Sequence, residues 1–259
     1  MKKIAAKNGV IWIKHGFRLF RKQPTELSLL FLIYMLSMFL ISYIPILGQL
    51  IPFILIPLFS MSFMQACVLI EKEEKVNPNL FLFILRDPAI ISLLTLGGFY
   101  LLAAIISIAA SSIIDGGMFW KLMSGQIQSN EIANEDFKNL PLSMLFSIFV
   151  YIPFAMGFWY AAPLTTWQRM SLLKSIFYSF FAVYNSGRAF IIYILGWITI
   201  GITLPAFISG ILGLILGHAF VAVIILMPLS IVLTIVMYCS FYPTYTDIFD
   251  NPDNLIVEA

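Results

Sequence analysis

Long uncharged runs alternate with short polar segments along this chain. Six runs are apolar and contain no Asp, Glu, Lys or Arg; they cover 27–44, 49–70, 89–114, 140–166, 189–209 and 214–242. A helix needs about 20 apolar residues to cross the hydrocarbon core of a bilayer. The runs are continuous rather than alternating, and they are longer than barrel strands. The pattern therefore predicts an all-α integral membrane protein with six transmembrane helices.

Composition supports this interpretation. The chain has 259 residues, of which 61% are hydrophobic and only 11% are charged, whereas about 25% of the residues of a typical soluble domain are charged. Because this number of charges is too small to provide a polar surface for a water-soluble protein of this size, lipid must surround most of the chain.

Residues 1–25 form a basic amphipathic arm before the first run. On a helix, Val10, Ile13, Phe17 and Phe20 share one face. The pattern is typical of a helix lying at the cytoplasmic membrane surface, with its cations near anionic headgroups. We expect the anchoring residues to be Trp12, Lys14, Phe17, Arg18, Arg21 and Lys22, together with Lys174 in a second such helix near 168–184. An RNA-binding arm is the alternative, but the interleaved aromatic residues favour membrane lipids over nucleic acid.

The distribution of basic residues predicts the orientation. Four segments would lie on one side of the membrane: the arm, 71–88, 167–188 and the acidic tail 243–259. Together they hold all the Lys and Arg except Lys121 and Lys138. Those two fall in the 115–139 loop on the other side. Because Lys and Arg accumulate on the cytoplasmic side, we expect a bacterial inner-membrane protein with both termini in the cytoplasm and 115–139 in the periplasm.

A weak internal repeat accompanies the spans. "GFRLFRKQPTELSLL" (16–30), "NLFLFILRDPAIISLL" (79–94) and "SIFYSFFAVYNSGRAFIIYILG" (175–196) each place Phe-rich sequence and a basic residue before a span. The pattern suggests three repeats of an interfacial helix plus a transmembrane hairpin, with a third, shorter surface helix near 79–86. Similarity through hydrophobic composition alone is the alternative.

Three stretches also carry a family resemblance. They are "GFRLFRKQP", "IPILGQLIPFILIPLFSMSFMQAC" and "FWYAAPLTTWQRMSLLKSIFYSFFAVYNSGRAFIIY". Together they resemble a family of betaproteobacterial six-span inner-membrane proteins of unknown function. The resemblance implies six spans and an inner-membrane location, and it carries over no catalytic or binding residue.

The sequence offers little chemistry. His15 and His218 should lie on opposite sides of the membrane, and metal-ligand spacings are absent. Cys67 and Cys239 are expected to be buried small residues, and Asp247, Asp250 and Asp253 to belong to a solvated acidic tail. We therefore expect no metal, no cofactor and no enzymatic activity.

Small residues spaced four apart predict close helix contacts. The candidates are Ala103, Ser107 and Ser111, Gly157 and Ala161, and Gly213 and Gly217. Their ordinary role is packing within the chain; self-association or docking of a partner membrane subunit is the alternative.

Two functions remain open. One is a non-enzymatic accessory or scaffold component acting through helix packing and lipid contact. The other is a transporter or channel for a neutral or lipidic substrate that uses proline-broken spans. A proton-driven pump is disfavoured, because no ionisable Asp, Glu, Lys or Arg lies within a span.

Overall fold

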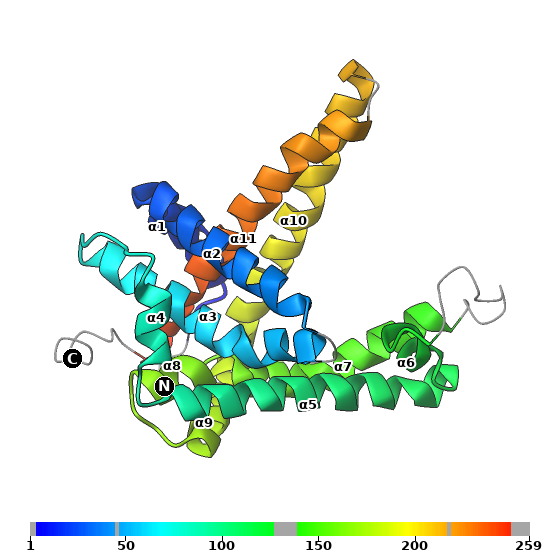
Figure 1. The fold of residues 1–259 in the computed structure, drawn as a ribbon, viewed down its shortest axis with the longest axis horizontal. Helices are drawn as coiled ribbons and strands as arrows, with labels where there is room; N and C mark the ends of the chain where they lie inside the picture. Colours follow the sequence, from blue (N-terminus) through cyan, green and yellow to red (C-terminus); the bar gives the residue numbers. More distant parts are fainter. Residues whose placement is uncertain (1–3, 45–46, 127–138, 217–218, 250–259) are drawn as a thin grey trace.

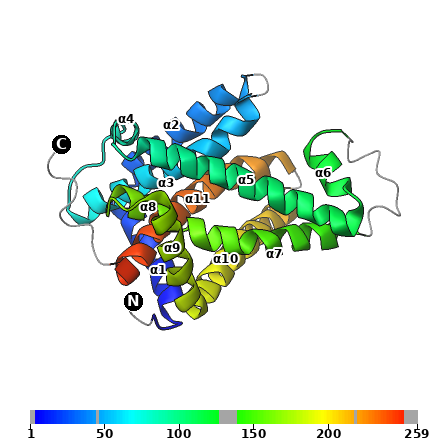
Figure 2. The same ribbon diagram turned by 90° about the horizontal axis from the view of Figure 1, so that it is seen from below.

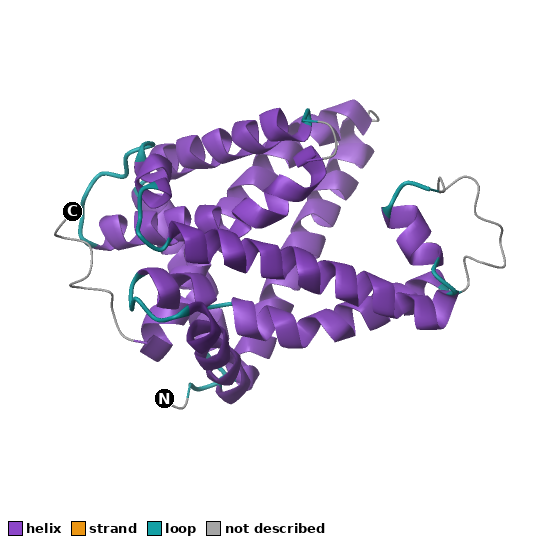
Figure 3. Ribbon diagram, turned by 60° about the horizontal axis from the view of Figure 1, so that its bottom comes forward, coloured by secondary structure: helices purple, strands orange, loops and turns teal. Residues whose placement is uncertain are grey.

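The computed structural model describes residues 4–44, 47–126, 139–216 and 219–249, and within these ranges it describes only the backbone of 47, 49 and 212–225. The described part of the chain is helical and contains no strand (Figure 3). Its helices are α1 (Asn8–Lys22), α2 (Pro24–Ser42), α3 (Leu47–Glu71), α4 (Leu80–Leu85), α5 (Ile90–Asp115), α6 (Met118–Met123), α7 (Leu140–Phe158), α8 (Ala161–Thr166), α9 (Leu172–Asn185), α10 (Gly187–Leu216) and α11 (Ala219–Phe249).

Six helical segments are long and apolar enough to cross a membrane, which confirms the predicted all-α class and number of spans. They form three antiparallel hairpins, α2–α3, α5–α7 and α10–α11, which diverge from a common base (Figure 1). The short helices α1, α4, α8 and α9 gather toward this base, whereas α6 lies at the far end of the α5–α7 hairpin (Figure 2).

The fourth span is interrupted, which its sequence run did not indicate. α7 ends at Phe158, and the chain continues into the short helix α8. Pro163 has no N–H to donate to the carbonyl of Trp159, so the regular i to i−4 bonding cannot pass through this point. At the same break the Tyr160 N–H donates to the Ser179 hydroxyl of α9, at 2.8 Å, and that hydroxyl donates to the carbonyl of Met156, the acceptor that the Tyr160 N–H would have in a continuous helix.

Each short helix that precedes a hairpin packs mainly on a different hairpin. α1 precedes α2–α3 but packs on α10 and α11, and α4 precedes α5 but packs on α3. α9 precedes α10 but packs on α7. The three hairpins are thereby linked in a ring.

Burial is concentrated at the base and along α3. In the most apolar stretch of α3, 67% of the residues are buried by the protein, against 6% in α10. Large apolar side chains are exposed along α10; they include Ile191, Ile194, Leu195, Ile198, Ile202 and Phe207. So many exposed apolar side chains are stable in hydrocarbon and unfavourable in water.

Candidate functional site

α1 packs closely on the α10–α11 hairpin through two glycines. A Cβ atom at Gly16 would lie 2.7 Å from the Cβ of Ser240 in α11, and one at Gly9 would lie 2.8 Å from the Tyr193 nitrogen in α10. Trp12 and Leu19, on the same face, are fully buried. The apolar face of this amphipathic helix therefore meets protein over most of its length.

Trp12 is not the headgroup-level anchor that the sequence suggested. Its indole ring is fully buried and contacts Phe190 and Tyr193. The indole N–H donates to the Asp247 carboxylate at 2.7 Å, and the side-chain amide of Asn8 donates to the same oxygen at 2.9 Å. A buried indole N–H needs an acceptor, and the end of α11 supplies one.

The same contact corrects the predicted boundary of the acidic tail. Residues 243–249 belong to α11, which continues through Pro243 to Phe249. Thr244 and Tyr245 are buried, and the half-buried Asp247 accepts hydrogen bonds from two residues of α1. Asp250 and Asp253 lie outside the described residues.

The outer face of α1 carries the predicted cations. Lys14, Arg18, Arg21 and Lys22 are exposed and, together with Phe17, line an open cavity of about 700 Å³. The ring of Phe17 stacks on Trp197 of α10, with centroids 6.3 Å apart. No carboxylate among the described residues forms an ion pair with any of these four cations. The positive charge of this surface is therefore available to an external anion.

α9 turns its polar side inward. Ser175 and Ser179 are fully buried, and the Ser179 hydroxyl donates to the Met156 carbonyl of α7 at 2.8 Å. Leu173 and Phe177 point outward, with 75% and 62% of their surface exposed. Lys174 is exposed beside them, with its Nζ 5.8 Å from the centre of the Tyr178 ring. An outward apolar face with a lysine at its edge suits a lipid surface better than water.

The small-residue positions fall at different helix contacts. Ala103, Ser107 and Ser111 of α5 are buried where α5 packs on α7, whose Ser143 and Ser147 are also buried. A Cβ at Gly157 would lie 3.1 Å from Ile176 of α9, and Ala161 is fully buried. Gly213 lies where only the backbone of α10 is described, and Gly217 lies outside the described residues.

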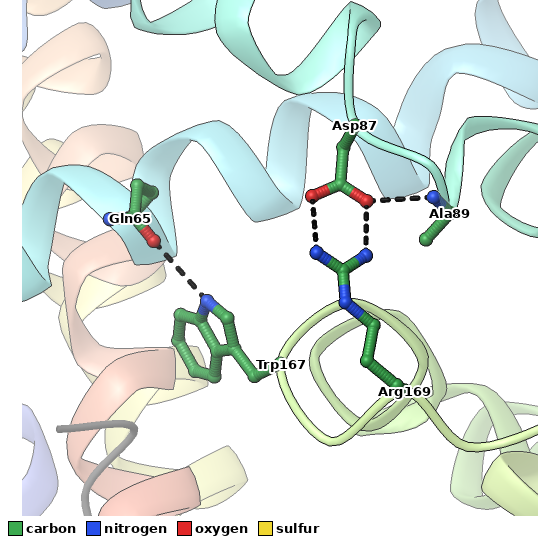
Figure 4. A network of polar contacts seen from close by, with 5 residues as sticks. All are labelled: Gln65, Asp87, Ala89, Trp167 and Arg169. Carbon is green, nitrogen blue, oxygen red and sulfur yellow. Dashed lines mark hydrogen bonds and ion pairs between the residues drawn. The ribbon is translucent and has the colours of Figure 1, made fainter. Parts of the chain in front are cut away.

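Sequence reasoning missed a polar network at the base (Figure 4). The guanidinium of Arg169 donates two hydrogen bonds to the Asp87 carboxylate, at 2.6 and 3.3 Å, and Asp87 also accepts from the Ala89 N–H. Two residues earlier, the Trp167 indole donates to the Gln65 side chain of α3 at 3.2 Å. The α8–α9 connection is thus tied to α3 and to the α4–α5 connection. An acid before a proline and an arginine before an interfacial helix were the only signals in the sequence.

The His and Cys side chains that the structure describes do not assemble into one site. His15 forms a hydrogen bond with the Glu71 carboxylate at 2.7 Å, and His218 lies outside the described residues. Cys67 and Cys239 are both buried, with the Cys67 sulfur 3.9 Å from the Cys239 carbonyl oxygen. Among the described residues no group of three or more His, Cys, Asp or Glu could hold a metal ion.

These features define a polytopic α-helical membrane protein with a compact base and hairpins that expose apolar side chains. The chain is 33% identical over 253 residues to the probable inner membrane protein BTH_II0599 of Burkholderia thailandensis, covering 95% of this chain and 92% of that protein. It therefore belongs to the same family of betaproteobacterial inner-membrane proteins, which confirms the resemblance. No family model matches the chain, and no solved structure matches it.

Proposed function

We propose that this inner-membrane protein is a non-enzymatic accessory or scaffold component that acts through contact with anionic lipid and through helix packing. The observation that carries the proposal is the cationic surface of α1, formed by Lys14, Arg18, Arg21 and Lys22, none of which pairs with a carboxylate that the structure describes. Each basic residue near an anionic membrane surface contributes about 1 kcal/mol. Four of them held rigidly on one helix would retain anionic headgroups around this face of the protein.

The way α1 is held supports a role for its cations beyond general attraction. Gly9, Trp12 and Gly16 clamp the helix to α10 and α11, so the charged side chains extend from a fixed surface. The outward-facing apolar residues of α9 support a second contact with lipid at the base. The orientation follows from the positive-inside rule and places both termini in the cytoplasm.

Lipid retention tests the cationic surface. A variant with Lys14→Gln, Arg18→Gln, Arg21→Gln and Lys22→Gln should lose co-purifying anionic phospholipid during detergent exchange, measured by lipid mass spectrometry. Equal retention by this variant and the unaltered protein would contradict the proposal.

A matched control removes four charges elsewhere on the chain. This control changes the net charge equally and should leave lipid retention unchanged; its substitutions are Lys72→Gln, Lys75→Gln, Arg86→Gln and Lys121→Gln.

Reporter fusions test the orientation. A reporter fused after Lys75 should report the cytoplasm, and one fused after Ala133 should report the periplasm. Exchanged readouts would reverse the topology.

Transport of a neutral or lipidic substrate is the second candidate. Prolines inside helices favour it, since α3 contains Pro52 and Pro57, α7 contains Pro153 and α11 contains Pro228. Proline interrupts the backbone hydrogen bonding of a span, and such interruptions build substrate sites in transporters. Purification in a mild detergent separates the candidates: a stoichiometric protein partner supports the accessory role, and a bound solute without a partner supports transport.

A further inference from the structure

A second cavity lies where the three hairpins meet, away from the cationic surface of α1. Its volume is about 280 Å³, and residues of α3, α5, α7 and α11 line it. Five of the lining side chains are aromatic: Tyr100, Tyr151, Trp159, Tyr238 and Phe241. Each of the three hairpins contributes to the wall, so the cavity exists only in the assembled fold.

The lining restricts the chemistry of a ligand. None of the described residues that line the cavity is charged, so a charged headgroup would lose its hydration there without a counter-charge. The volume is just below the roughly 300–1,000 Å³ of small-molecule sites. It accommodates one ring or part of one chain rather than a whole phospholipid. Aromatic walls favour a flat or linear apolar group.

Two hydroxyl groups in the wall have no hydrogen-bond partner among the described residues. The Tyr100 hydroxyl donates to the Phe158 carbonyl at 3.4 Å. The hydroxyls of Tyr151 and Ser60 form no hydrogen bond with any residue that the structure describes. Within the apolar layer, where water is scarce, an unpaired hydroxyl is costly. A ligand with an acceptor oxygen would satisfy one of these donors.

We infer that this cavity binds a neutral, lipid-soluble molecule whose carbonyl oxygen accepts a hydrogen bond from Tyr151 or Ser60 while its apolar part lies among the aromatic rings. Two membrane components carry that chemistry: the ester group of a glycerolipid chain and the ring carbonyl of a quinone. The lining spans expose apolar side chains to their surroundings, so such a ligand reaches the cavity from the hydrocarbon. This site is separate from α1 and does not depend on the cationic surface.

Filling the cavity tests the inference. Ala155 lines the cavity on α7, and Ala155→Trp would occupy much of its volume. Ile152, on the same helix, has 46% of its surface exposed and does not line the cavity, so Ile152→Trp is the matched control. Native mass spectrometry of the full chain released from detergent should find about one bound small molecule in the unaltered protein and in Ile152→Trp, and none in Ala155→Trp.

A milder variant keeps the inference testable if Ala155→Trp does not fold. Tyr151→Phe removes only the hydroxyl, and loss of one hydrogen bond should weaken binding about fivefold. Solvent extraction and mass analysis then identify a glycerolipid or a quinone, and added phospholipid or ubiquinone-type quinone should restore occupancy accordingly. An unaltered protein with no bound molecule, or equal occupancy in Ala155→Trp and Ile152→Trp, would overturn the inference. Because every variant here retains the cations of α1, failure at this cavity leaves the lipid-retention result unaffected.

Discussion

Two adjacent glycines in α5 provide a direct test of how the hairpins pack. Gly97 faces α3: a Cβ added there would lie 2.5 Å from the Cα of Ile54 and 2.6 Å from its carbonyl carbon. At Gly98 no described atom lies within 4 Å of an added Cβ. The variants Gly97→Ala and Gly98→Ala therefore add the same methyl group to neighbouring positions of one helix. The added methyl group meets another helix only in Gly97→Ala.

The expected difference follows from that geometry. Optimal carbon contacts are about 3.5–4.0 Å apart, so Gly97→Ala forces α3 and α5 apart by roughly 1 Å. Ile54 would move through its backbone, which a rotamer change cannot relieve. Overpacking of this kind costs about 1–3 kcal/mol. Replacing glycine by alanine within a helix also gains about 0.5–1 kcal/mol at both positions. The difference between the variants therefore isolates the cost of packing.

Thermal unfolding in mild detergent, followed by near-ultraviolet circular dichroism, measures this difference. For a chain of this length, each kcal/mol corresponds to about 2–4 °C in Tm. Gly98→Ala should unfold at or slightly above the temperature of the unaltered protein, and Gly97→Ala several degrees below it. Equal shifts in the two variants, or a larger loss in Gly98→Ala, would refute the close crossing of α3 and α5.

Two further substitutions address the base. Trp12→Phe keeps an aromatic ring but removes the N–H that donates to Asp247. Loss of a hydrogen bond to a partly buried carboxylate should lower the free energy of unfolding by about 1.5–3 kcal/mol. An unchanged denaturation midpoint would show that this contact is dispensable. Arg169→Ala breaks the ion pair with Asp87, in which 48% of the arginine side chain is exposed to solvent. Because solvent screens such a pair, a double-mutant cycle with Asp87→Asn should give a coupling free energy of at most about 1 kcal/mol. This coupling should fall when salt is added. A larger, salt-independent coupling would show that the pair is shielded from solvent.

The α1 helix illustrates how far sequence reasoning reaches. Its amphipathic pattern and its cations were recognisable from residues 9–22, and α1 occupies Asn8–Lys22. The partner of its apolar face was not recognisable, because lipid tails and apolar protein surfaces attract the same side chains. Gly9 and Gly16, spaced two helical turns apart on that face, were the available signal of close contact with another helix.

The polar network and the second cavity could not be anticipated for a related reason. Arg169 and Asp87 are 82 positions apart in the chain, and the residues that line the cavity come from three hairpins. Their proximity depends on the helix packing angles and on which hairpin each short helix contacts. Neither is encoded in local periodicity.

By itself the sequence determined that six uncharged segments form helices in a membrane, because hydrocarbon excludes charges and requires every backbone hydrogen bond to be satisfied within the segment. Only the tertiary structure decided which face of each helix meets protein and which meets lipid. Both surroundings are apolar, so hydrophobicity cannot distinguish them, and shape complementarity at contacts such as Gly97 on Ile54 makes the choice.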